Sequence, residues 1–297
     1  MAGFFSLVAF LSLVFLPFAG FFLALLAPLP LVYLVAGGRP SLLGWGWVAV
    51  VMAGATLTLQ VEWLAALTLG YILLTVWPAV SVELWLRRSW STGRWAAILS
   101  VGALAMASLG TVAFFAPAPP ADALAERLAA AVRDSGSMAS LFGVGGEEVV
   151  ATALRTTAFL LPAIVALYVM CVALFLRPRL ALLGIPRGGG SFRAYASEEW
   201  LPIGFALGGL GWVFATGMAK WIAGNLLVTV LGLYFVHGLA IIFFYLGRWI
   251  GDNRWLRLAV LIFALQLPVT VVLSGLGIAD SFFRLRRPEG PEGGNQS

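Results

Sequence analysis

Two long apolar runs near the carboxyl end of the chain decide its fold class. Residues 222–246 read IAGNLLVTVLGLYFVHGLAIIFFYL, and residues 255–278 read WLRLAVLIFALQLPVTVVLSGLGI. A helix rises about 1.5 Å per residue, so about 20 apolar residues cross the roughly 30 Å hydrocarbon layer of a bilayer. Each run is therefore long enough to span a membrane. A short charged turn, residues 247–254, joins the two runs.

The composition of the whole chain agrees with these runs. The 297 residues are 61% hydrophobic and only 10% charged, with a mean hydropathy of +0.99. Soluble domains carry about 25% charged residues. In lipid only helices and closed barrels satisfy every backbone polar group, and long unbroken apolar runs favour helices over alternating barrel strands. We predict an all-α polytopic transmembrane bundle of eight or nine spans, with residues 1–283 as one domain and 284–297 as a polar, disordered tail.

The other spans are expected where the remaining apolar runs lie. Residues 4–36 are too long for one span, and we expect two short spans that meet near Pro17, the second bent at Pro28-Leu29-Pro30. The first of them has no basic segment before it and no clean cleavage site after it, so we expect it to be retained. The further spans are expected at residues 42–59, 63–86, 95–116, 149–176 and 200–216.

A stripe of small residues and one polar loop are the main features of these segments. Small residues recur on one helical face of the run 200–216, which predicts a helix-packing seam; they are Gly204, Gly208, Gly211 and Ala215. Residues 117–148 form the only sizeable polar insertion, with an amphipathic helix predicted over 121–134. This helix is expected either in the membrane interface or, as we favour, packed on the ends of its own spans.

The distribution of charge predicts the orientation in the membrane. The net charge of +5 is scattered over short loops and forms no basic face, which argues against a nucleic-acid partner. Most arginines lie in residues 87–94, 177–199 and 247–254, so the positive-inside rule places these loops in the cytoplasm and the polar insertion outside. We expect a multi-pass protein of the bacterial cytoplasmic membrane.

The arginines of the tail, Arg284, Arg286 and Arg287, are an exception to this rule if the run 255–278 crosses completely. Either that run does not cross, or the stronger loops upstream override the tail. We favour the second explanation.

Single polar side chains near the middle of the last two runs are the best candidates for a functional site. His237 and Gln266 each lie near the centre of an apolar run, where a polar group without a partner is costly. We predict that the two helices lie antiparallel and that these side chains meet, with Tyr234 on the same face and Asn225 and Thr229 extending the site. A ligand, an ion or a proton would suit such a site. The alternative is an interhelical hydrogen bond worth about 0.6–2 kcal/mol, with Asn225 and Thr229 serving only to cap and pack the helix.

Two local features are open to both functional and structural explanations. Pro268 has no N–H, so it is expected to free a carbonyl one turn earlier, near Ala264. Such discontinuous backbone binds substrates in several transporters, although a kink for packing is the commoner outcome. Glu198 and Glu199 precede the run that starts at Trp200 and are expected to cap that helix at its positive end.

Several kinds of chemistry are not supported by the residues present. His237 is the only histidine and Cys171 the only cysteine, so no metal site and no internal disulfide are expected. The glycine-rich residues 143–146 and 188–190 lack the Lys-Ser/Thr of a P-loop. No Ser/His/acid set is expected either, because the only histidine lies in mid-membrane. We predict that the protein is not an enzyme, has no cofactor and has no ATPase of its own.

With these residues identified, the chain resembles the YybS-like family of bacterial multi-pass membrane proteins, whose function is unknown. The family usually closes with an acid, two residues and Phe-Asp-Phe-Arg, whereas Asp280 is followed here by Ser281-Phe282-Phe283-Arg284. The segments that carry the resemblance extend over most of the chain: 27–33, the arginine-rich turn after Leu86, Trp200-Leu201-Pro202, Asn225-Leu226, Tyr234, 238–240 and 276–280.

That family is distantly similar to the substrate-binding membrane subunits of energy-coupling-factor vitamin transporters. The resemblance implies a transport-type subunit that binds a small molecule and depends on separate ATPase and coupling membrane proteins, but it names no substrate. The alternative function is a non-transporting scaffold or assembly factor that holds partner proteins through its glycine seam and its arginine-rich loops.

Overall fold

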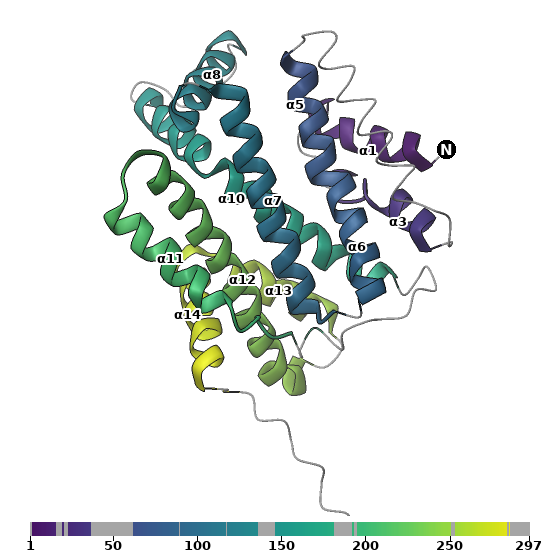
Figure 1. Cartoon of the computed structure of the whole chain (residues 1–297). Coiled ribbons are helices and arrows are strands. Elements are labelled where there is room, and N and C mark those ends of the chain that lie inside the picture. Colours follow the sequence, from purple (N-terminus) through teal and green to yellow (C-terminus); the bar gives the residue numbers. More distant parts are fainter. Residues whose placement is uncertain are drawn as a thin grey trace, which may run out of the picture.

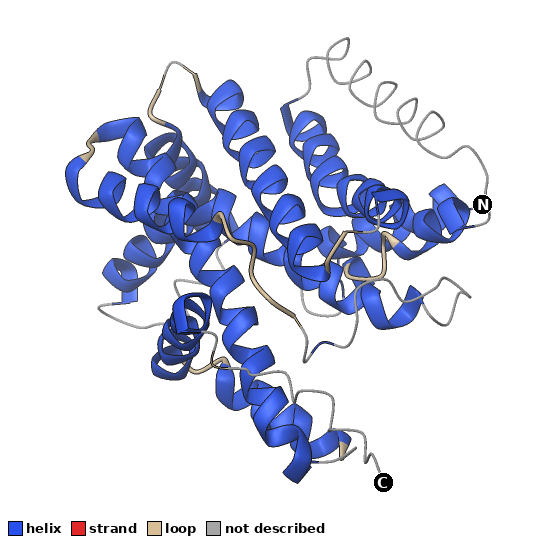
Figure 2. Cartoon of the chain, turned by 60° about the horizontal axis from the view of Figure 1, so that its bottom comes forward, coloured by secondary structure: helices blue, strands red, loops and turns tan. Residues whose placement is uncertain are grey.

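The structure, a computed structural model, is built of helices joined by short loops and contains no strand in the part of the chain that it describes (Figure 2). The all-α prediction is confirmed for that part. The described residues are 2–15, 20, 23–36, 62–88, 90–116, 118–135, 146–180, 192, 195–250, 253–283 and 285.

The helices follow the predicted apolar runs closely. In chain order they are α1 (Ala2–Phe15), α3 (Leu29–Ala36), α5 (Glu62–Tyr71), the π-helical turn η1 (Ile72–Val76), α6 (Trp77–Arg88), α7 (Thr92–Phe115), α8 (Pro120–Ser135), α10 (Gly146–Leu180), α11 (Leu201–Phe214), α12 (Gly217–Ile250), α13 (Arg254–Ala264) and α14 (Leu267–Phe283). α7, α10 and α12 pack on one another in the middle of the bundle, with α1, α3, α5 and α6 on one side and α11 and α14 on the other (Figure 1).

Four of the described helices are long and apolar enough to cross a membrane. They cover Ala65–Arg88, Thr92–Phe115, Glu148–Arg177 and Gly217–Leu246. α13 and α14 pass the same test only as a pair, and they are bent by 94° at the break between them. The predicted count of eight or nine spans is therefore not confirmed. The run 200–216 forms only the shorter helix α11, and the expected span at 42–59 lies outside the described residues.

The bend predicted at Pro28-Leu29-Pro30 is present, whereas the junction predicted near Pro17 lies outside the described residues. α1 ends at Phe15, just before Pro17, and a turn over residues 25–28 precedes α3. Pro28 lies at the end of this turn, where its carbonyl accepts from the N–H of Val32 at 2.9 Å. Proline fits the start of a helix better than its interior. The turn over residues 25–28 therefore separates α3 from the part of the run that precedes it.

The amphipathic helix of the polar insertion, α8, lies where the sequence analysis favoured it. α8 packs against α10 and the end of α7. The Arg127 guanidinium lies over the rings of Phe114 and Phe115, 5.3 and 5.4 Å from their centroids. The amphipathic helix is therefore held by the ends of its neighbouring spans.

The glycine stripe on α11 is a packing seam, as predicted. A Cβ atom built on Gly208 lies 2.9 Å from the backbone nitrogen of Leu227, and one built on Gly211 lies 2.6 Å from the Cβ of Ala223. The later residue of α11, Gly211, thus meets the earlier residue of α12, so these two helices are antiparallel. Small residues let the two backbones approach closely, which is how helices without a hydrophobic drive associate in lipid.

A second close approach joins α12 and α14. A Cβ atom built on Gly277 lies 2.2 Å from the Tyr234 carbonyl oxygen, and one built on Gly238 lies 1.9 Å from the Leu273 carbonyl oxygen. Neither position has room for a side chain. The backbones of α12 and α14 are therefore in direct contact where they cross.

α13 and α14 do not form the one straight helix that the sequence analysis assumed over residues 255–278. After the 94° bend, the carbonyl of Leu285 accepts a 2.8 Å hydrogen bond from the Tyr245 hydroxyl, near the end of α12. The chain thus leaves α12 at Ile250 and returns to the same end of that helix. The reason is the break at Gln266, where α13 stops and α14 starts in a new direction.

We expect Gly277→Ala to weaken the fold by about 1–3 kcal/mol, because the added methyl group collides with backbone that cannot rotate away. Gly275→Ala is the matched control: it lies on the same helix, and nothing lies within 4 Å of its added Cβ. It should be neutral or stabilising by up to about 1 kcal/mol through helix propensity. Thermal unfolding of the two variants in one mild detergent makes the comparison. Equal midpoints would show that the two helices are not in contact at Gly277.

Candidate functional site

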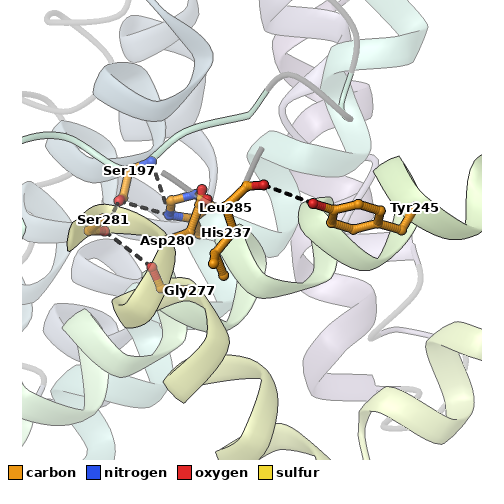
Figure 3. A network of polar contacts seen from close by, with 7 residues as sticks. All are labelled: Ser197, His237, Tyr245, Gly277, Asp280, Ser281 and Leu285. Atoms are coloured by element: carbon orange, nitrogen blue, oxygen red, sulfur yellow. Dashed lines mark hydrogen bonds and ion pairs between the residues drawn. The ribbon is translucent and has the colours of Figure 1, made fainter. Parts of the chain in front are cut away.

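A buried polar set lies where α12, α14 and the segment that precedes α11 meet (Figure 3). His237, in the middle of α12, bonds Asp280 of α14 through Nε2, 2.8 Å from Oδ2. Its other ring nitrogen, Nδ1, lies 2.8 Å from the hydroxyl oxygen of Ser197. The side chains of His237 and Asp280 are only 3% and 7% exposed. An ionisable pair is thus enclosed inside the helical body.

The hydrogen bonds continue beyond the histidine. The Ser197 hydroxyl lies 3.0 Å from the Ser281 hydroxyl, which donates to the carbonyl of Gly277 at 3.1 Å. The backbone N–H of Ser197 also approaches His237 Nδ1, at 3.4 Å. The result is one chain of contacts from Asp280 through His237, Ser197 and Ser281 to a backbone carbonyl (Figure 3). We call Ser197, His237, Asp280 and Ser281 the polar set.

The helix contact at Gly277 determines the position of the polar set. With Gly277 against the backbone of α12, the next residues on that side of α14 are brought directly onto His237. A larger residue at Gly277 would move Asp280 out of hydrogen-bonding range. The glycine and the acid thus belong to one arrangement.

Residues 195–198 form an extended segment that is fixed from both sides. On one side Ser197 belongs to the polar set. On the other, Glu198 accepts from the Ser91 hydroxyl at 2.9 Å and from Arg94 Nε at 3.1 Å, at the amino end of α7. A Cβ atom on Gly93 would lie 1.9 Å from the Ala196 carbonyl oxygen, so this segment lies directly on α7. Segment 195–198 therefore links α7 to the buried pair.

The start of α7 is itself well anchored. Trp85 and Trp95 stack at 4.8 Å between ring centroids. The Trp95 indole donates to the Ser81 hydroxyl at 3.0 Å, and the Trp85 indole donates to the Trp90 carbonyl at 2.8 Å. Buried indole N–H groups need such acceptors. The start of α7, on which segment 195–198 lies, is therefore held by packed aromatic side chains.

Comparison with protein families identifies the chain. The family described as "Predicted membrane protein (DUF2232)" matches residues 4–281. The chain belongs to this family. Comparison with curated proteins and with solved structures gave no match.

Gln266 takes no part in the site of this DUF2232 protein, contrary to the predicted pairing with His237. Its side chain is exposed at the break between α13 and α14, while both ring nitrogens of His237 bond other groups. The prediction was wrong because it assumed one straight helix over residues 255–278. The freed carbonyl that Pro268 predicted does occur, since the Thr270 hydroxyl donates to the Ala264 carbonyl at 2.9 Å.

Tyr234 lies next to the polar set, as its spacing from His237 predicted. Its side chain is fully buried and packs edge-on against Phe205. Its hydroxyl lies beside Ser281 but makes no hydrogen bond of acceptable geometry with the described residues. A buried hydroxyl without a partner costs free energy.

Tyr195 covers the other side of the imidazole. Its ring meets that of His237 edge-on, 6.3 Å between centroids. Burial raises the pKa of Tyr195, and the neighbouring Glu198 carboxylate raises it further. The phenol therefore stays neutral in segment 195–198.

Asn225 and Thr229 form hydrogen bonds with backbone groups. They were expected either to extend a ligand site or to cap and pack the helix. The Asn225 carboxamide accepts from the N–H of Ala163 at 3.0 Å and donates to the carbonyl of Phe159 at 2.9 Å. These two groups would otherwise bond each other within α10, next to Pro162. The Thr229 hydroxyl donates to the Asn225 carbonyl at 2.8 Å. Asn225 thus joins α12 to α10 at the proline.

Two residues of the set, Ser197 and Asp280, were not predicted as site residues. The expectation that no Ser/His/acid set forms is incorrect, because segment 195–198 reaches the buried histidine. Asp280 carried one signal, as an acid at the end of the last apolar run and inside a segment of the family resemblance. Ser197 lies in a polar loop and carried none. Glu198, expected to cap the next helix, instead binds Ser91 and Arg94.

The described residues contain no group of three metal-ligating side chains. The polar set offers groups for hydrogen bonding and for proton exchange. A carboxylate next to an imidazole suits both.

We expect Asn225→Leu to lower the free energy of unfolding by about 2 kcal/mol, since the N–H of Ala163 and the carbonyl of Phe159 lose their buried partner. In a Pro162→Ala background the Ala163 N–H and the Phe159 carbonyl are able to bond each other within α10. Asn225→Leu should then lower the free energy of unfolding by about 1 kcal/mol less than it does in the wild-type chain. Thermal unfolding of the two single variants and the double variant measures this coupling. Additive effects would rule out the insertion of Asn225 into α10.

Proposed function

We propose that this DUF2232 protein is a transport-type subunit that binds a small polar molecule at the polar set and has no ATPase of its own. We place it in the bacterial cytoplasmic membrane, working with separate ATPase and coupling membrane proteins. The observation that carries the proposal is the His237–Asp280 pair, enclosed among apolar helices at a hydrogen-bonding distance of 2.8 Å.

Energetics favours a functional role for this pair over a structural one. Removing two ionisable groups from water costs several kcal/mol each, and well-packed apolar residues often replace a buried pair at no loss of stability. Ionisable residues within membrane segments are rare, and most of them mark paths or sites for ions and substrates. The His237–Asp280 pair fits that pattern.

Three further features support a site that accepts a small polar molecule. The Tyr234 hydroxyl is buried without a hydrogen-bond partner among the described residues, so it offers a donor and an acceptor next to Ser281. The sequence lacks a P-loop, which agrees with a subunit driven by another protein. The distant resemblance to substrate-binding subunits of energy-coupling-factor transporters points in the same direction.

A serine hydrolase is the main rival, because the polar set contains Ser197, His237 and Asp280. In hydrolases the serine faces Nε2 and the acid faces Nδ1, and nearby backbone N–H groups bind the oxyanion. In this protein the arrangement is reversed: Ser197 faces Nδ1 and Asp280 faces Nε2. The backbone N–H of Ser197 also points to the imidazole. This geometry leaves no oxyanion donor at Ser197 itself, so we propose that the protein is not an enzyme.

We expect protein purified in its native lipids to release a small polar molecule in near-stoichiometric amount on denaturation. Mass spectrometry of the released fraction identifies it. The double variant His237→Leu/Asp280→Leu should keep the fold, because the pair is replaced as a unit, and should lose at least about 90% of the bound molecule. His237→Ala should lose it as well.

Ser274→Ala is the matched control for this experiment. Ser274 is buried on α14 and donates only to the backbone carbonyls of Leu231 and Thr270, so its loss should leave the bound molecule in place. Equal release from wild type and the double variant would refute the proposed site. A chain that carries no small molecule and co-purifies only with partner proteins would support the scaffold function instead.

A fluorophosphonate probe, which labels activated serines, should leave Ser197 unmodified at neutral pH because the imidazole is not placed to activate it. Mass spectrometry of the intact protein makes the measurement, with a known serine hydrolase in the same detergent as the positive control. Labelling that disappears in Ser197→Ala would show that the protein is a hydrolase.

A further inference from the structure

A short non-helical stretch connects two buried anchors at the start of α11. Tyr195 and Leu201 are 2% and 1% exposed, and both belong to the apolar cluster that α7, α10 and α12 share. Residues 195–198 form no helix, and Ala196 and Glu199 between the anchors are exposed. Stretches with few buried apolar contacts are among the parts of a fold that open most easily. Polar contacts therefore have to hold this stretch in place.

The inner side of segment 195–198 covers the polar set. The Ser197 hydroxyl lies 2.8 Å from His237 Nδ1, and the ring of Tyr195 meets the imidazole edge-on (Figure 3). Ala196, between these two residues, is exposed. The segment thus lies between the surface and an imidazole that is only 3% exposed. It closes this side of the site.

The outer side of the segment is held at the amino end of α7. The Glu198 carboxylate accepts from the Ser91 hydroxyl at 2.9 Å and from Arg94 Nε at 3.1 Å. We call these three residues the latch. The side chain of Arg94 is 54% exposed, so water competes for its ion pair, and ion pairs of this kind are weak. The latch is therefore able to break without unfolding the helices around it.

We infer that residues 196–198 form a lid over the polar set and that the latch keeps this lid closed. When the Glu198 carboxylate leaves its partners on α7, the adjacent Ser197 is free to leave the imidazole. Tyr195 and Leu201 stay packed in the apolar cluster and form the fixed ends of the lid.

The lid opens toward one side of the membrane. Its residues lie in the stretch 177–199 and the other two latch residues in the stretch 87–94, and the positive-inside rule assigns both stretches to the cytoplasm. The lid thus controls exchange between the polar set and that compartment.

Because His237 is the only histidine, its chemical protection measures how well the lid is closed. Diethyl pyrocarbonate transfers an ethoxycarbonyl group to an imidazole nitrogen, and mass spectrometry of the peptide gives the rate. In lipid nanodiscs at neutral pH we expect the wild-type chain to react much more slowly than free imidazole. Glu198→Ala removes both latch contacts and should raise the rate about tenfold, because hydrogen bonds to a charged group are lost. Arg94→Gln should raise it about threefold.

Gly93→Ala tests the lid without changing any charge. A Cβ atom built on Gly93 collides with the Ala196 carbonyl oxygen, so the added methyl group pushes the segment away from α7. The rate at His237 should rise here too. Two matched controls should keep the wild-type rate. Gly209→Ala adds a methyl group with nothing within 4 Å, and Lys220→Gln removes a cation at the far end of α12.

Hydrogen–deuterium exchange distinguishes an open lid from a loosened protein. In Glu198→Ala the peptide that contains Ser197 should exchange faster, while the peptides of α12 and the thermal midpoint stay close to wild type. Equal acceleration in α12 would show general loosening and overturn the inference. A faster reaction at His237 without faster exchange at Ser197 would also overturn it, because the reagent then enters elsewhere. A rate that neither Glu198→Ala nor Gly93→Ala raises would do the same.

This inference deepens the proposed function and rests on it for the molecule that passes the lid. The two fail separately, because the lid is tested with diethyl pyrocarbonate and deuterium alone. A latch-dependent rate in protein that releases no small molecule would refute the bound molecule and leave the lid. A released small molecule beside a histidine whose rate ignores the latch would do the reverse.

Discussion

The direct backbone contact between α12 and α14 is the constraint on which the rest of the site depends. Gly238 and Gly277 leave no side chain between the two helices, so their backbones touch. Only at this separation does a short acidic side chain reach an imidazole on the neighbouring helix at 2.8 Å. Close approach of this kind is a general means of helix association in lipid, where apolar side chains gain little from leaving the hydrocarbon. Here it also brings two ionisable groups together.

Backbone hydrogen bonding in an apolar surrounding imposes the second constraint. Every N–H and carbonyl away from water needs a partner. At Pro162 the Asn225 carboxamide supplies two, and at the break beside Gln266 the Thr270 hydroxyl supplies one for Ala264. Several of the polar side chains in the apolar runs are explained in this way. The polar set differs because its side chains bond mainly to one another.

Comparing these backbone-bonding side chains with the polar set shows how much of the site can be predicted from the sequence. Long apolar runs predict helices because hydrocarbon permits little else, and the spacing of Gly204, Gly208 and Gly211 predicts a seam because helical faces follow from chain position alone. The partner of His237 is not predictable in this way. It depends on a bend at Gln266, which changes the depth of every later residue, and on residues 195–198, which have no periodic pattern. Gln266 was the predicted partner because it lies near the centre of the neighbouring run, whereas His237 in fact bonds Ser197 and Asp280.

The return of the chain to Tyr245 has a consequence for the topology of the protein. Because α14 ends beside the end of α12 from which the chain passes to α13, this kinked pair would add no crossing if it enters the bilayer from that end. In that arrangement the arginines at positions 284, 286 and 287 would add to the basic turn at 247–254, and the positive-inside rule would hold for them too. The number of crossings made by this last segment thus depends on the bend between α13 and α14.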